Sequence, residues 1–297
     1  WSNLVGRLIF LVVIIHAMVF ALVACGSETD QAPEKTSASK ISETVEDVSK
    51  LDTRRARRSA GSMTGNTSAS TEVVAEGEAV FPDPLVDEMI RLKLDQPVGP
   101  ILISDLKQLT ALNLGLELYV ADLSGLEHLV NITELDLTQN QVTDLSPIAS
   151  LTKLTSLDLA QNDITDISPL TLLTNLTFLR IQDNLVTDIS PLAGLTKLTE
   201  LNLWTNEISD ISPLAALTDI TFLHLTSNKI SDLSPLASLT NVTKLELTKN
   251  EITDLSPLLQ TGFGEGAEIR LWGEPLDAHS IDVVIPQLEA AGVKVQF

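Results

Sequence analysis

The stretch LDLAQNDITDISPL, residues 157–170, returns almost unchanged as LELTKNEITDLSPL at residues 245–258. The same pattern recurs every 22 residues, and two polar residue types keep the period: Asn140, Asn162, Asn184, Asn206, Asn228 and Asn250, and Asp144, Asp166, Asp188, Asp210, Asp232 and Asp254. A fixed period of this length indicates a repeat architecture. One copy cannot bury its own apolar residues, so we predict stacked copies that share a continuous core.

Within one copy the apolar spacing fits neither a helix nor a strand throughout. The copy that begins at Leu154 has apolar residues at Leu154, Leu157, Leu159, Ile164, Ile167, Leu170 and Leu173. Residues 157–159 alternate as a short strand does. Ser168 and Pro169 predict the N-cap and the first-turn proline of a short helical or 3₁₀ return. Asn162 marks the corner between these two segments.

The full pattern, LxxLxLxxNxIxDLSPLxxL, resembles a leucine-rich repeat, and its 22-residue form with SPL is similar to the internalin-type class. Six regular copies begin at Ile132, Leu154, Leu176, Leu198, Ile220 and Val242, with irregular copies near residues 109–114 and 272–276. The resemblance implies an α/β solenoid that is curved, with a parallel β-sheet on its concave face, short 3₁₀ or helical returns on its convex face, and a cap at each end. It also implies a ligand-binding surface protein.

The chain divides into five predicted segments. Residues 79–108 form a helical N-terminal cap, in which the segment 82–97 is an amphipathic helix with Leu85, Met89, Ile90 and Leu94 inward. Residues 109–263 hold the repeats, and residues 264–297 form the terminal repeat and the C-terminal cap. Because capped solenoid ends oppose end-to-end association, we expect a monomer.

The N-terminal segments point to export. Residues 8–24 are an apolar run, and LVAC at 22–25 resembles the lipobox of bacterial lipoproteins. The resemblance implies that residues 1–24 are a signal peptide and that Cys25 carries the lipid. The alternative is an uncleaved anchor, and both alternatives place the rest of the chain in the bacterial envelope, facing away from the cytoplasm. For the lipidated form we expect membrane contact through the lipid alone, at the outer membrane or the cell surface.

Composition restricts the remaining segment and the partners. Residues 25–78 are rich in Ser, Thr, Glu, Lys and Ala, which predicts a disordered linker. Its basic cluster at 54–58 is either solvated or in contact with anionic headgroups. The formal charge of −21 opposes nucleic acid as a partner. The single cysteine excludes an internal disulfide and a Cys-rich metal site.

The two polar ladders have structural explanations. We expect the six asparagines to satisfy backbone groups at the corners of the coil. We expect the six aspartates to accept hydrogen bonds in the turn that enters each return. The alternative is a calcium ladder, which is disfavoured because each copy offers one carboxylate where calcium needs six to eight oxygens. We therefore predict no metal and no cofactor.

Side chains that alternate with the inward leucines form three outward columns on the predicted sheet. The first column is Glu134, Ser156, Phe178, Glu200, Phe222, Lys244 and Glu268; the second is Asp136, Asp158, Arg180, Asn202, His224, Glu246 and Arg270; the third is Thr138, Ala160, Gln182, Trp204, Thr226, Thr248 and Trp272. We expect none of these positions to be needed for the core.

Four of the chain's few aromatic residues fall in these columns, which predicts an interaction surface. The predicted partner-binding residues are Phe178, Arg180, Trp204, Phe222, His224, Lys244 and Trp272. Asp136 and Asp158 make one end of the face acidic. The alternatives are rings that pack on one another or under a loop, and a face without a ligand.

The columns bring together no nucleophile with a base, no paired acids and no metal set, so we predict that the chain is not an enzyme. His224 lies one strand from Asn202 and Glu246, a position typical of a surface contact. The predicted function is a binding module that captures a protein on its concave face. A glycan-binding protein and a structural spacer of the envelope are the alternatives.

Overall fold

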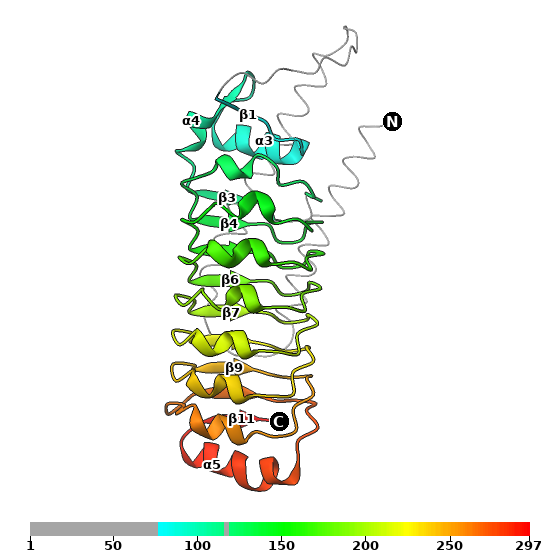
Figure 1. The fold of residues 1–297 in the computed structure, drawn as a ribbon, viewed down its shortest axis with the longest axis vertical. Helices are drawn as coiled ribbons and strands as arrows, with labels where there is room; N and C mark the ends of the chain where they lie inside the picture. The colour runs from blue at the N-terminus through cyan, green and yellow to red at the C-terminus, as the bar shows by residue number, and fades with distance from the viewer. Residues whose placement is uncertain (1–76, 116–118) are drawn as a thin grey trace, which may run out of the picture. The chain divides into compact units, whose positions relative to one another are not determined.

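The computed structural model describes residues 77–115 and 119–297 of the chain. The predicted signal peptide, Cys25 and nearly all of the predicted linker lie outside the described residues. The described part is a stack of coils, one strand per coil (Figure 1). Its sheet runs in the order β3 (Ala111–Asn113), β4 (Glu134–Asp136), β5 (Ser156–Asp158), β6 (Phe178–Arg180), β7 (Glu200–Asn202), β8 (Phe222–His224), β9 (Lys244–Glu246), β10 (Glu268–Arg270) and β11 (Lys294–Gln296).

Neighbouring strands of this sheet are parallel, and their register follows the repeat. Leu157 of β5 pairs with Leu179 of β6, which lies 22 residues later. Between β9 and β10 the step grows to 24 residues, because Ile269 pairs with Leu245. The parallel solenoid predicted from the sequence is therefore confirmed, and its register aligns the outward columns.

A short 3₁₀ helix forms most of the returns opposite the sheet: η1 (Leu126–His128), η2 (Ser146–Ile148), η3 (Ser168–Leu172), η4 (Ser190–Leu192), η5 (Ser212–Ala216), η6 (Ser234–Ser238) and η7 (Ser256–Gln260). The prediction that Ser168 is an N-cap is wrong, because Ser168 is the first residue of η3 and the cap residue is Ile167. Asp166 supplies the missing side-chain acceptor. Its Oδ1 accepts from the Ser168 N–H at 2.8 Å, and its Oδ2 accepts from the Ser168 hydroxyl at 3.0 Å.

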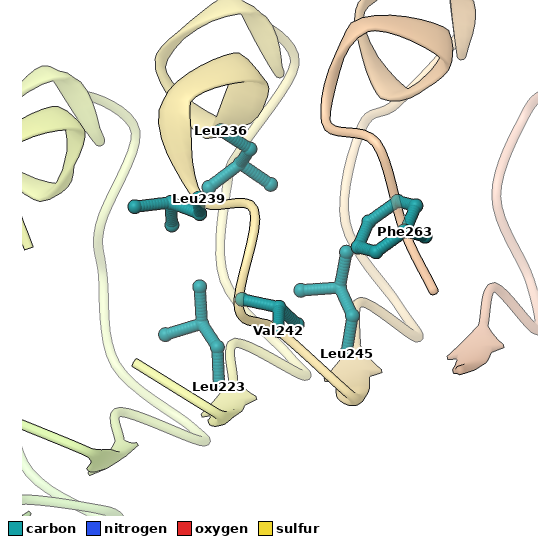
Figure 2. Close-up of a pocket in the computed structure, with 6 residues that line it drawn as sticks. All are labelled: Leu223, Leu236, Leu239, Val242, Leu245 and Phe263. Atoms are coloured by element: carbon teal, nitrogen blue, oxygen red, sulfur yellow. The ribbon is translucent and has the colours of Figure 1, made fainter. Parts of the chain in front are cut away.

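The core is a continuous column of Leu, Ile and Val side chains. Figure 2 shows its least regular part, where Phe263 lies beside Val242 and Leu245. The loop after η7 carries Thr261 and Phe263 instead of the usual leucines, and Phe263 packs against the core from that loop. The gap that remains is too small for a water molecule, so it is a packing irregularity rather than a ligand site.

The asparagines at the corners join each coil to the preceding one. Asn184 is buried, its Oδ1 accepts from the Ile164 N–H at 3.0 Å, and its Nδ2 donates to the Leu159 carbonyl at 2.9 Å. The other five make equivalent bonds. Asn250 is only partly buried, because the coil that follows it is irregular.

The residue before each of these asparagines has a positive φ. These residues are Gln139, Gln161, Asp183, Thr205, Ser227 and Lys249, with φ between 52° and 60°. Left-handed backbone disfavours side chains, and a β-branched residue such as Thr205 most of all. The turn is thus imposed by the stacking rather than by local preference.

The N-terminal end differs in detail from the expected helix. Helix α3 (Pro84–Lys93) buries Val86, Met89 and Ile90, whereas Leu85 and Leu94 are only partly buried. Leu85 and Leu94 pack against the core as predicted, and the prediction missed Val86, which is fully buried. A two-stranded antiparallel sheet of β1 (Glu78–Ala79) and β2 (Ile101–Leu102), followed by α4 (Ile103–Leu106), completes this end. Because β1 begins at Glu78, the predicted linker overlaps it by one residue.

The C-terminal end closes the core with η8 (Ser280–Val284), α5 (Ile285–Ala290) and the added strand β11. Glu274 lies where the next corner asparagine would stand. Its two carboxylate oxygens accept from the backbone N–H groups of Asn250 and Ile252. Over residues 77–115 and 119–297, no helix has the length and apolar character that crossing a membrane requires.

Candidate partner-binding face

The predicted binding residues lie on the solvent side of the sheet. Phe178 and Arg180 belong to β6, Phe222 and His224 to β8, and Lys244 to β9. Trp204 and Trp272 follow β7 and β10 by two residues and are 40% and 50% exposed. Two column members are nonetheless buried, Ala160 and Glu246, so the expectation that no column position is needed for the core is wrong at both.

Three side chains make direct ring contacts, and we call Trp204, Phe222 and His224 the ring cluster. The Trp204 and His224 rings are stacked, with centroids 5.7 Å apart and planes within 4° of each other. Phe222 lies tilted at 52° to His224, with centroids 6.0 Å apart. The alternative that the rings pack on one another is therefore confirmed in part, although Trp204 remains partly exposed.

The other predicted residues flank this cluster. The Arg180 guanidinium lies 4.7 Å from the centroid of the Phe178 ring, and the Lys244 ammonium 5.2 Å from that of Phe222. Both distances are those of cation–π contacts. Trp272 lies three strands from Trp204, about 14 Å at the usual strand spacing, and stands apart from the ring cluster.

The environment of His224 keeps its imidazole neutral. Burial lowers its pKa, and the positive charges of Lys244 and Arg270 lower it further, to about 4 from 6.5. At neutral pH the ring cluster therefore carries no charge of its own. Its surface can offer apolar area and π-electron density to a partner.

A buried carboxylate, Glu246, lies beside the cluster, and its burial was not predicted. Glu246 accepts from Arg270 at 2.8 Å, and the Lys244 ammonium lies 3.5 Å from the same Oε1 atom. The register of this pair was predicted, since Glu246 and Arg270 are neighbours in the second column. Opposite charges on neighbouring strands are the signal that could have found it.

The N-terminal end of the face is acidic. Asp136 accepts from the Asn113 side chain at 3.1 Å, and Asp158 lies 3.5 Å from the Arg180 guanidinium. Burial raises the pKa of Asp158, and the neighbouring charge of Asp136 raises it further, against the lowering effect of Arg180. Arg180 thus compensates this negative charge incompletely.

One polar group between these two regions has no partner. The Oε1 atom of Gln182, in the third column beside Trp204, is buried without a hydrogen bond to any described residue. Among the described residues, no group of three or more His, Cys, Asp or Glu side chains could hold a metal ion. The contacts formed on this face are ring contacts, ion pairs and hydrogen bonds, which suit recognition.

Comparison with known proteins places these features in a family. Residues 130–172, 174–216 and 218–260 match a model of leucine-rich repeats. The crystal structure of an internalin (inlF) from Listeria monocytogenes is 35% identical with a TM-score of 0.68, and the match covers 75% of this chain and 66% of that one. An internalin C2 (inlC2) from the same species is 33% identical with a TM-score of 0.54, covering 69% of this chain and 99% of that one.

A more distant structure shares the fold alone. The leucine-rich repeat protein LIC12759 of Leptospira interrogans is 23% identical, with a TM-score of 0.57, over 66% of this chain and 50% of that one. The chain has no match among curated protein sequences. It spans about two thirds of the length of the first internalin and nearly all of the second.

Proposed function

Because the chain belongs to the internalin-type leucine-rich repeat proteins, we propose that it captures a protein partner on its concave sheet face, with the ring cluster at the centre of the contact. The leucine-rich repeat fold is generally a protein-binding scaffold. The single observation that carries the proposal is the placement of Phe178, Trp204, Phe222 and Trp272 on the solvent side of a sheet whose core is complete without them.

The size of these rings suits a contact of moderate affinity. If a partner covered about 100 Å² of each, four rings would contribute about 10 kcal/mol at roughly 25 cal/mol per Å². Association costs of about 4–15 kcal/mol offset most of this gain. Ion pairs at the margin of the rings are therefore needed for specificity and tight binding.

The proposed setting is the bacterial envelope. Lipid on Cys25 would hold the chain at a membrane, with its binding face directed away from the cytoplasm and no other membrane contact. In cells that make the full chain, a Cys25→Ser variant should lose the lipid-sized mass increment and leave the membrane fraction. An unchanged mass and an unchanged fraction would contradict the anchor, without touching the proposal for the sheet face.

The test of the face is a double substitution with a matched control. The variant Trp204→Ala with Phe222→Ala removes ring area from the cluster, whereas Leu172→Ala with Leu185→Ala removes exposed apolar area outside the sheet. Immobilised full chain is mixed with host-cell, neighbouring-cell or envelope extract, and retained proteins are identified by mass spectrometry. We expect the ring variant to lose the proteins that wild type and control retain, with thermal midpoints within about 2 °C of each other.

Two outcomes contradict this proposal. Equal retention by all three proteins would show that the rings are not the contact, as the spacer alternative requires. A collapse of stability in the ring variant alone would show that the rings serve the fold. Retention that glycosidase treatment of the extract abolishes would move the assignment to a glycan.

A further inference from the structure

We propose that the partner of this face is a basic protein segment, one that presents Lys or Arg side chains beside an apolar or aromatic group. This inference rests on the proposed function and specifies the chemistry of the partner. It follows from how the charges on the sheet face are already paired.

Every cation on the face is engaged by groups of the chain itself. The solvent side of β4 to β11 carries four: Arg180, Lys244, Arg270 and Lys294. Arg180 lies against Asp158 and Phe178, and Lys244 lies between Glu246 and Phe222. Arg270 donates to Glu246 and Gln296, and Lys294 donates to Glu268. An acidic partner would have to share these cations with the carboxylates and rings of the chain that already contact them.

The carboxylates of the face are in excess of its cations. The same surface holds Glu134, Asp136, Asp158, Glu200, Glu246 and Glu268. Glu246 and Glu268 form ion pairs with cations of the face, and Asp158 forms one with Arg180. Glu134 and Glu200 are exposed, and Glu200 begins the strand that leads to Trp204. These groups can accept a partner's cations without giving up an ion pair.

The ring cluster agrees with this charge preference. Neutral His224 stacks on Trp204, so the exposed indole meets a partner without a positive charge behind it. Trp is the aromatic ring that attracts cations best. Because Phe178 and Phe222 already have cations over their rings, Trp204 and Trp272 are the rings of the face that a partner's Arg or Lys can approach.

The field of the whole chain acts in the same direction. A formal charge of −21 attracts basic proteins over a distance and repels acidic ones. This long-range term speeds encounter but does not choose a site. The exposed carboxylates of Glu134 and Glu200 supply the local selection, and substitution separates the two contributions.

The experiment selects peptides on the immobilised full chain. The probe is a phage-displayed library of random peptides in which basic and acidic residues are equally frequent. The face variant is Glu134→Gln with Glu200→Gln. Its matched control is Asp163→Asn with Glu251→Gln, which removes the same charge from exposed positions outside the three columns. The variant Trp204→Ala with Phe222→Ala tests whether selection depends on the rings.

We expect wild type and the charge control to enrich basic peptides that also hold an aromatic or large apolar residue. The face variant should bind those peptides roughly 2- to 25-fold more weakly, the range for two exposed ion pairs. Enrichment of neutral or acidic peptides that depends on the rings would overturn this inference and leave the proposed function in place. If basic peptides are enriched but the face variant and the charge control weaken their binding equally, the inference is also overturned. No enrichment over the ring variant would overturn both proposals.

Discussion

Replacing Asn184 by alanine tests whether the corner asparagines hold the coils together. The change would leave the buried Ile164 N–H without the acceptor that lies at 3.0 Å. The Leu159 carbonyl would lose the bond at 2.9 Å but keep the one that the Asn162 side chain donates at 3.1 Å. Leaving a buried polar group unsatisfied costs about 1–3 kcal/mol. One such group, together with the weakened carbonyl bonds, predicts a loss of about 2 kcal/mol.

Thermal unfolding followed by circular dichroism measures this loss in the full chain. At about 2–4 °C per kcal/mol for a domain of this size, the midpoint should fall by about 4–8 °C. The matched control is Asn241→Ala, because Asn241 is exposed and donates one hydrogen bond, to the Thr218 carbonyl at 2.9 Å. We expect the control to change stability by less than about 1 kcal/mol.

The reasoning also predicts a dependence on position. Asn250 is only partly buried, so Asn250→Ala should cost less than Asn184→Ala. A loss for Asn184→Ala no larger than that of the Asn241 control would refute the claim that these amides satisfy the buried corners. It would mean that leucine packing alone holds the stack.

Four further predictions concern single residues. Because the pKa of His224 is lowered to about 4, the unfolded chain binds a proton between about pH 6.5 and 4 that the folded chain does not. As the pH is lowered through that window, the free energy of unfolding should decrease by about 1–2 kcal/mol more in wild type than in His224→Gln. An equal decrease in both proteins, measured by urea unfolding, would contradict this. Glu274→Ala should destabilise by about 1–3 kcal/mol, and Glu274→Gln by less, because the glutamate accepts from two backbone N–H groups; equal midpoints for both variants would argue against that role. Gln182→Met should raise the thermal midpoint or leave it unchanged, since it removes an unpaired buried oxygen, and a clear drop would show that the oxygen has a partner in solution. Thr205→Gly should be neutral or stabilising by up to about 1 kcal/mol because it relieves a φ of 52°, whereas a loss larger than that of Thr226→Gly would contradict the strain.

The fold was predictable because each sequence signal has one structural explanation. The spacing of Leu157 and Leu159 requires a strand, the Asp166 to Pro169 stretch requires a turn, and the 22-residue period requires stacking in register. The outward columns then followed from alternation alone. These features depend on local geometry that repeats, so six copies of the pattern reinforced one another.

Details that depend on contacts between non-equivalent residues were not predictable. The residues with positive φ, from Gln139 to Lys249, are of five different types, so residue type alone does not reveal the left-handed turn before each corner asparagine. The burial of Glu246 and the role of Glu274 arise from the irregular last coil, where the period changes. The burial of Val86 beside Leu85 in the N-terminal core was also missed.

The direction of the asparagine bonds gives the chain a polarity that matters during synthesis. Each asparagine Oδ1 accepts from a backbone N–H twenty residues earlier. A coil that has left the ribosome therefore has one corner N–H without an acceptor until the next coil has been synthesised. Deletion of residues 177–198, one whole period, would join equivalent positions, so every corner N–H would still find an asparagine acceptor. A deletion one residue shorter would shift all later asparagines out of reach of the corners they complete.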